Sequence, residues 1–114
     1  MNDDFWTDLD RLIRESRIVI DRPKGSRHPF FQENIYPLDY GYLEGTTSGD
    51  GEGIDLYLGS QNDRALSAVI LTVDLHERDA EIKLVLGCTA EETQVALDHL
   101  NSFGLRALLV NRMP

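Results

Sequence analysis

The sequence has few cysteines, few lysines and no long hydrophobic run. Cys88 is the only cysteine among 114 residues, so an internal disulfide cannot form, which indicates a reducing compartment. Lys24 and Lys83 are the only lysines, and 11 basic against 20 acidic residues give a net charge of −9. Because such a chain repels the phosphates of nucleic acids and of anionic lipids, we expect neither as a partner.

Targeting and membrane segments are also not evident. The longest apolar runs fall short of the roughly 18 residues that a membrane-spanning helix needs. The N-terminal segment, MNDDFWTDLD, lacks the basic and apolar regions of a signal peptide. We therefore expect a cytoplasmic protein that makes no membrane contact. Length and composition, with 41% hydrophobic and 27% charged residues, predict one globular domain over residues 1–114.

Two helices are predicted near the ends of the chain. The first belongs to the N-terminal segment 1–16, where Phe5, Leu9 and Ile13 recur at helical spacing. The second begins at Thr89, because Glu92 three residues later completes the pattern of a capping box. Gly104 is expected to end this helix.

The remaining apolar segments predict short strands. They lie at 18–20, 35–42, 54–58, 66–74, 81–87 and 106–111, separated by turn-forming residues. Clustered strands with helices at the margins predict an α+β, mainly β, fold or a small closed barrel, and argue against a doubly wound parallel sheet.

The densest acidic signal is the glycine-rich segment Asp50-Gly51-Glu52-Gly53-Ile54-Asp55. Carboxylates on a sharply turning loop can converge on a hard cation such as Mg²⁺. The same segment is also typical of a polar β-turn with no ligand. Asp74 and Asp79 flank a later hairpin turn and reach the same cation if the fold brings that turn beside the loop. In isolation, they are more simply two solvated turn residues.

Tyrosines precede the acidic segment in the run Tyr36-Pro37-Leu38-Asp39-Tyr40-Gly41-Tyr42. Their spacing places the three tyrosines on one face, where the hydroxyls can donate to phosphate oxygens or the rings can pack in the core. The histidines are too scattered along the chain for a zinc site or a catalytic triad, and Cys88 has no evident base beside it.

Taken together, the tyrosine and acidic segments and the distance between them resemble the soluble family I inorganic pyrophosphatases. The segment Ile18-Val19-Ile20-Asp21 is similar to the first acidic strand of that family, and the pair Asp74 and Asp79 is similar to its second pair of metal-binding aspartates. The resemblance implies a small OB-like five-stranded β-barrel with helices alongside. It also implies hydrolysis of pyrophosphate to two phosphates with several Mg²⁺ ions, by a protein that forms homo-oligomers.

The resemblance implies a role for individual residues. The metal ligands would be Asp50, Asp55 and Asp79, with Asp74 and Asp21 assisting further ions. Glu52 would stand at the position of the general base, beside Asp55. The substrate would be held by Tyr36, Tyr40 and either Lys24 or Arg27. Lys83 would act as the lysine after the hairpin, although an ungapped pairing places Glu81 there.

Several departures from the family pattern keep other functions open. Glu52 replaces an aspartate, Gly53 replaces a proline, and His99-Leu100-Asn101 occupies the region where the family carries a Tyr-Lys pair for phosphate. Two alternatives follow. One is a hydrolase of a nucleotide or another diphosphate. The other is a catalytically weak or inactive pyrophosphatase-like module that is retained for binding or assembly.

Overall fold

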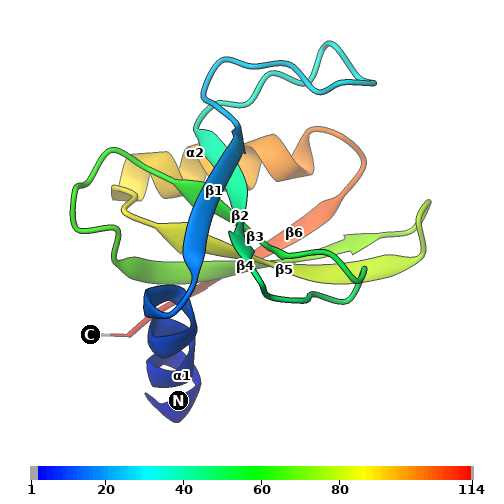
Figure 1. Ribbon diagram of the computed structural model, residues 1–114. Coiled ribbons are helices and arrows are strands. Elements are labelled where there is room, and N and C mark those ends of the chain that lie inside the picture. Colours follow the sequence, from blue (N-terminus) through cyan, green and yellow to red (C-terminus); the bar gives the residue numbers. More distant parts are fainter. Residues whose placement is uncertain (1–2, 114) are drawn as a thin grey trace.

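The computed structural model describes residues 3–113, with the side chain of residue 3 left aside. Helix α1 (Asp3–Arg14) leads into strand β1 (Arg17–Arg22), and strands β2 (Asp39–Glu44), β3 (Ile54–Leu58), β4 (Leu66–Asp74) and β5 (Asp79–Leu86) follow. Helix α2 (Ala90–Asn101) and strand β6 (Arg106–Asn111) complete the described chain (Figure 1). The predicted α+β class, with two helices and six strands, is confirmed.

The six strands form one mixed sheet in the order β1-β2-β3-β5-β4-β6. All neighbouring strands are antiparallel except β3 and β5, which are parallel and pair Asp55 with Lys83. The chain therefore crosses over between β3 and β5, and this crossover brings the acidic segment beside a strand that lies about thirty residues away in sequence.

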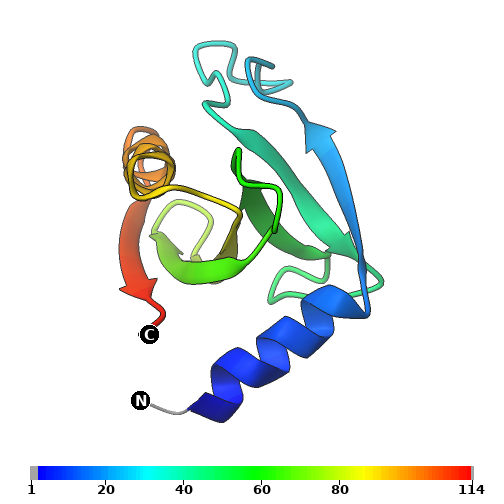
Figure 2. The same ribbon diagram turned by 90° about the vertical axis from the view of Figure 1, so that its left-hand side faces the viewer.

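The central strands are buried on both faces. On one face, Trp6 of α1 packs with Leu56 of β3 and Leu84 of β5. On the other face, Ala96 and Leu100 of α2 pack against a cluster that contains Tyr57, Ala68, Ile70 and Val85. Because side chains alternate along a strand, Tyr57, Asp55, Val85 and Lys83 all belong to the α2 face. Figure 2 shows the two helices lying against different parts of the curled sheet.

The barrel predicted from the family resemblance is wrong, because the sheet is not closed. Its edges are β1 and β6, which do not pair with each other within residues 3–113. Helix α1 bridges the two edges instead. It runs directly into β1, and its Asp10 carboxylate binds Arg112, just after β6, with oxygen to nitrogen distances of 2.8 Å. Trp6 fills the interior beside this bridge, so α1 occupies the space that closing strands would need.

The start of one predicted strand and the end of the second predicted helix both shift. The strand predicted at 35–42 begins at Asp39, because Pro37 cannot donate to a strand ladder and Ile35 makes only an isolated bridge to Arg27. Helix α2 has the expected capping box at Thr89. Its cap at the other end is Ser102, and Gly104 with φ +84° lies two residues further on.

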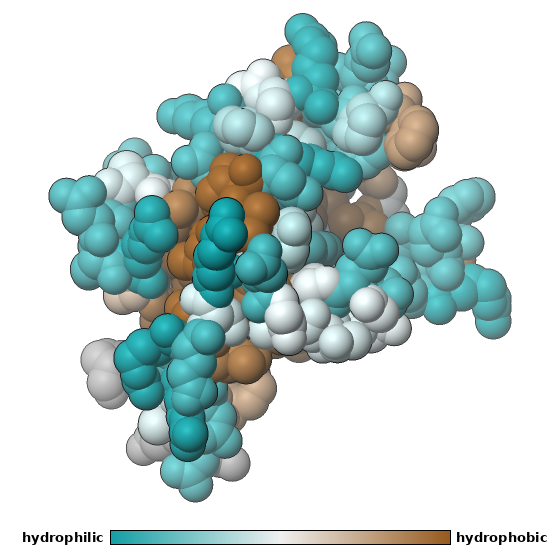
Figure 3. All heavy atoms as spheres, viewed as in Figure 1, coloured by the Kyte–Doolittle hydropathy of each residue, from teal (hydrophilic) through white to brown (hydrophobic). Residues whose placement is uncertain are grey.

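The surface is largely hydrophilic, as the acidic composition suggests. In Figure 3, hydrophilic residues cover most of the visible face, and hydrophobic residues reach the surface in the region of β1. No helix within the described residues is long and apolar enough to cross a membrane.

Candidate functional site

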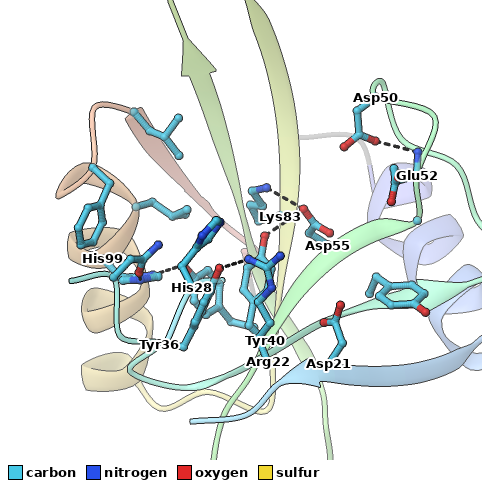
Figure 4. A pocket seen from close by; sticks show the side chains of 17 residues that line it. Asp21, Arg22, His28, Tyr36, Tyr40, Asp50, Glu52, Asp55, Lys83 and His99 are labelled. Carbon is cyan, nitrogen blue, oxygen red and sulfur yellow. Dashed lines mark hydrogen bonds and ion pairs between the residues drawn. The ribbon is translucent and has the colours of Figure 1, made fainter. Parts of the chain in front are cut away.

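A cavity of about 750 Å³ opens on the α2 face of the sheet, and the C-terminal part of α2 forms part of its lining. Strands, loops and α2 all contribute to it. Its polar lining consists of Asp21, Arg22, His28, Asn34, Tyr36, Tyr40, Tyr42, Asp50, Glu52, Asp55, Tyr57, Lys83 and His99. Figure 4 shows the acidic loop residues at one side of the cavity and His99 at the other, with Lys83, Asp55 and Tyr40 between them.

Asp55 and Lys83 form the centre of the site. The Lys83 ammonium donates to Asp55 Oδ2 at 2.8 Å, and the Tyr40 hydroxyl donates to the same oxygen at 2.9 Å. Lys83 is only 6% exposed. Burial disfavours its charge, but the Asp55 carboxylate, its hydrogen bond and the nearby Glu81 outweigh burial and raise the pKa of Lys83. The ion pair is therefore maintained at neutral pH.

The acidic loop lies beside this pair. Asp50 accepts hydrogen bonds from the Ser48 hydroxyl at 2.6 Å and from the Glu52 backbone N–H at 2.9 Å, and these bonds lower the pKa of Asp50. Its carboxylate also bonds to the Glu81 carboxyl group. Burial, followed by the charge of Asp50, raises the pKa of Glu81, although Lys83 opposes this at 3.7 Å. Asp50 is therefore the stronger acid of this pair, and Glu81 is the weaker one.

Aromatic rings and one arginine form the opposite wall. The Arg22 guanidinium donates to the Tyr36 hydroxyl and lies 5.5 Å from the centroid of the Tyr36 ring. Tyr36 packs against Tyr40 with ring centroids 5.2 Å apart. Burial, then the Asp55 charge, raises the pKa of Tyr40 well above its usual value, so its hydroxyl remains a hydrogen-bond donor. All three tyrosines of the predicted run line the cavity.

His99 connects α2 to this wall. Its Nδ1 bonds to the Tyr57 hydroxyl at 2.7 Å, and its Nε2 bonds to the amide oxygen of Asn34. Because the amide oxygen only accepts, Nε2 carries the proton, and Nδ1 of the neutral ring accepts from Tyr57. Burial lowers the pKa of His99, which favours this neutral form.

This burial predicts a pH-dependent stability. Because the pKa of His99 is lower in the folded state than the usual value of about 6.5, the unfolded chain binds the proton first as the pH falls. The contribution of His99 to the free energy of unfolding is thus fully present above about pH 6.5 and is lost as the pH falls below it. We expect His99→Gln to lose less stability than wild type between pH 7.5 and pH 5.5 in urea unfolding. His76→Gln, at an exposed turn, should lose as much stability as the wild type over this pH range. An equal loss of stability in all three proteins would contradict the role of the buried, neutral His99.

The sequence-predicted residues divide into two groups. The cavity brings together Asp21, Tyr36, Tyr40, Asp50, Glu52, Asp55 and Lys83. It does not include Lys24, whose backbone N–H donates to Asp39, or Arg27, whose guanidinium binds the Gln32 carbonyl. Arg22 lines the cavity in their place.

The hairpin acids lie outside the main cavity. Asp74 and Asp79 pair directly across the β4–β5 hairpin and line a separate depression at its tip. Alternation along β5 nevertheless places Asp79 on the same face as Glu81 and Lys83. The Asp74 carboxylate caps the turn by accepting from the backbone N–H groups of His76 and Glu77. The expectation that the turn and the acidic loop share one cavity is not met, and the metal-binding role of both acids stays a prediction.

Two further cavity residues, Arg22 and His99, were not predicted as site residues. Arg22 reaches the cavity through the pairing of β1 with β2, and His99 through its bond to Asn34, which is far away in the chain. The one hint for His99 was its place in the region where the family carries a Tyr-Lys pair.

The chemistry of the acidic donors fits Mg²⁺, which prefers oxygen ligands and usually takes one or two carboxylates with waters and substrate phosphates. Asp50 and Asp55 line the same cavity, and the hydrogen bonds to Asp55 both go to Oδ2. Within residues 3–113, no group of three or more His, Cys, Asp or Glu side chains is arranged to hold an ion by itself. The donor set therefore fits a cation that is shared with a phosphate ligand.

Comparison with known proteins gives no further guide to this site. The chain matches no protein-family model, no curated protein and no solved structure.

Proposed function

We propose that the protein is a Mg²⁺-dependent hydrolase of inorganic diphosphate, with the cavity as its active site. One observation carries the proposal: carboxylates suited to Mg²⁺ and cationic donors suited to phosphate line the same cavity and meet at the Asp55–Lys83 pair. A protein with a net charge of −9 needs cations to hold a multiply charged anion. The resemblance of the tyrosine and acidic segments to family I pyrophosphatases supports the same activity.

In this proposal, Asp50 and Asp55 hold Mg²⁺, with Asp21 as a further carboxylate ligand. When bound, the ion neutralises phosphate charge and lowers the pKa of a water molecule. Lys83 and Arg22 donate to phosphate oxygens, and the Tyr36 and Tyr40 hydroxyls orient them. Glu52, in the exposed loop, takes the proton from the attacking water.

The finer fold assignment belongs to the same proposal. We place β1 to β5, in their spatial order β1-β2-β3-β5-β4, as the OB-like part of the sheet, and β6 as an added edge strand. The OB-fold is a partly open Greek-key arrangement, so an open sheet with a crossover between β3 and β5 supports this assignment. A homo-oligomer also stays part of the proposal, because a second copy would bury further surface of a small domain.

A second candidate is a module that binds diphosphate without turnover. It is favoured by the position of Asp74 and Asp79, which line a different depression from the acidic loop. With fewer carboxylates at the cavity, fewer metal ions are held there, and charge stabilisation of the leaving phosphate is weaker.

Release of orthophosphate from inorganic diphosphate, with and without Mg²⁺, tests the proposal. We expect Mg²⁺-dependent release by the wild type and a loss of about 10²-fold or more in kcat for Glu52→Gln, because the variant lacks the base. Asp55→Ala should be inactive. Asp8→Ala, an exposed change on α1 outside the cavity lining, should behave as the wild type.

The outcomes separate the two candidates. Equal release by wild type, Glu52→Gln and Asp55→Ala would contradict the proposed hydrolase. Diphosphate binding without release by the wild type would support the binding module. Asp55→Ala leaves the buried Lys83 without its main partner, so the folding of this variant is checked by circular dichroism. If Asp55→Ala is unfolded, the comparison of Glu52→Gln with wild type decides the test.

A further inference from the structure

The cavity has two chemically different ends. Asp50, Glu52 and the Asp55–Lys83 pair form one end, which the proposed function assigns to the diphosphate and Mg²⁺. The other end is built by the β1–β2 loop, by α2 and by the turn before β6. Its lining residues are His28, Asn34, His99, Leu100, Phe103 and Leu105. In Figure 4, His99 lies across the cavity from Asp50 and Glu52, with Lys83 and Asp55 between them.

This second end is mainly aromatic, and Arg22 lies beside it. The Arg22 guanidinium donates to the Tyr36 hydroxyl on the adjoining wall, and its charge, after burial, lowers the pKa of His28. Burial lowers the pKa of His99. The ring of Phe103 meets His99 edge to face at a centroid distance of 5.8 Å, and Phe103 is still 46% exposed. Such a surface offers ring faces and the amide of Asn34.

The size of the cavity also exceeds the needs of inorganic diphosphate. Its volume of about 750 Å³ lies within the range of roughly 300–1,000 Å³ typical of sites for larger organic ligands. At roughly 30 Å³ per water molecule, it equals about 25 waters. A neighbouring cavity of about 370 Å³ shares Asn34 and Phe103 with it and adds Phe31 and the acidic Glu33. Phe31 therefore extends the aromatic surface beyond the part that faces the acidic loop, beside one carboxylate.

We propose that the hydrolase also takes nucleoside diphosphates, with the diphosphate at the Asp55–Lys83 end and the base against Phe103 and Asn34. The inference rests on the proposed hydrolase and extends its substrates from inorganic diphosphate to nucleoside diphosphates. An exposed aromatic ring stacks on any base. The amide oxygen of Asn34 already accepts from His99, and the NH2 group of the same amide can donate to a base edge. Ring faces and an amide donor suit a neutral heterocycle better than a second inorganic anion.

The reaction consumes one water. The oxygen of water forms a bond to the terminal phosphorus, and the bond from that phosphorus to the bridging oxygen breaks. The electron pair of the broken bond stays on the bridging oxygen, which becomes part of the nucleoside monophosphate. The products are orthophosphate, the nucleoside monophosphate and one proton, which Glu52 accepts first.

Binding and turnover are measured separately to test the inference. Isothermal titration calorimetry with Mg²⁺ compares α,β-methylene adenosine diphosphate with methylenediphosphonate, neither of which is cleaved at its methylene bridge. Orthophosphate release compares adenosine diphosphate with inorganic diphosphate. We expect the nucleotide analogue to bind about tenfold more tightly, because stacking on one aromatic side chain contributes this much.

The variant Phe103→Ala should lose about tenfold in affinity for the nucleotide analogue and change its affinity for methylenediphosphonate less than about twofold. Phe5→Ala is the matched control, since Phe5 is also 46% exposed but lies on α1, outside the cavity lining. It should leave both affinities unchanged.

Equal affinities for the two analogues, or a Phe103→Ala variant that weakens both equally, would overturn the nucleotide assignment. Release of phosphate from inorganic diphosphate would then leave the proposed function standing. If neither analogue binds and neither substrate is hydrolysed, the proposed function fails, and the nucleotide assignment fails with it.

Discussion

Replacing Gly41 by alanine is expected to destabilise the protein by roughly 3 kcal/mol or more. Gly41 is buried in β2 and faces Ile20 of β1 in the sheet register. A Cβ atom at this position would lie 1.8 Å from the Val19 carbonyl oxygen and 2.9 Å from the Ile20 Cα. Both are backbone atoms, so the added methyl group must separate β1 from β2, and no side-chain rotation relieves the overlap.

Urea unfolding followed by circular dichroism measures the effect. With a slope of roughly 1–3 kcal/mol per molar urea, the midpoint should fall by about 1 M or more. Gly49→Ala is the matched control. A Cβ atom there meets only the Ala80 carbonyl oxygen, at an ordinary 3.7 Å, and its stability should remain within about 0.5 kcal/mol of wild type. A Gly41→Ala midpoint equal to that of Gly49→Ala would contradict the close approach of β1 and β2.

The same close approach explains why Gly41 bears on the site. Strand β1 carries Asp21 and Arg22, and β2 carries Tyr40 and Tyr42, all of which line the cavity. If β1 moves away from β2, Arg22 moves away from the aromatic wall. The glycine that the sequence places between two tyrosines is therefore required by packing between strands.

Local pattern was enough to predict most of the elements. Alternation of apolar and polar residues located β4 and β5, and the Thr89 and Glu92 pair located the start of α2. Glu92 also binds the backbone N–H and hydroxyl of Ser60, at 3.1–3.2 Å, and so holds α2 against the loop after β3. This second role joins residues thirty-two positions apart, and no local pattern indicates it.

Long-range arrangement was harder to predict from the sequence. The six segments do not specify whether the sheet closes, because closure depends on whether α1 or another strand occupies the gap between β1 and β6. The acidic loop and the tyrosines were predicted together and do line one cavity. Arg22 and His99 were missed, since each reaches the cavity only through pairing and packing that the sequence does not encode locally.

Asp55 and Lys83 should differ sharply in what their removal does to stability. Asp55→Asn leaves the Lys83 ammonium, 6% exposed, with Glu81 at 3.7 Å as its nearest remaining acidic partner. Removing one partner of a buried ion pair costs roughly 3–5 kcal/mol. Lys83→Met removes that charge and keeps an apolar chain of similar length. The Asp55 side chain that remains is 28% exposed to the cavity and still accepts from Tyr40, so we expect a loss of less than about 1 kcal/mol.

A double-mutant cycle in urea tests this asymmetry. Asp55→Asn should cost much less in the Lys83→Met background than in wild type, because the buried charge is already gone. Both single variants should nevertheless lose Mg²⁺-dependent phosphate release, since one removes a proposed metal ligand and the other a proposed phosphate donor. A Lys83→Met protein that is stable but inactive would separate the functional role of this lysine from its structural one. Equal destabilisation by the two single variants, with additive effects in the double variant, would show that Asp55 does not compensate a buried charge on Lys83.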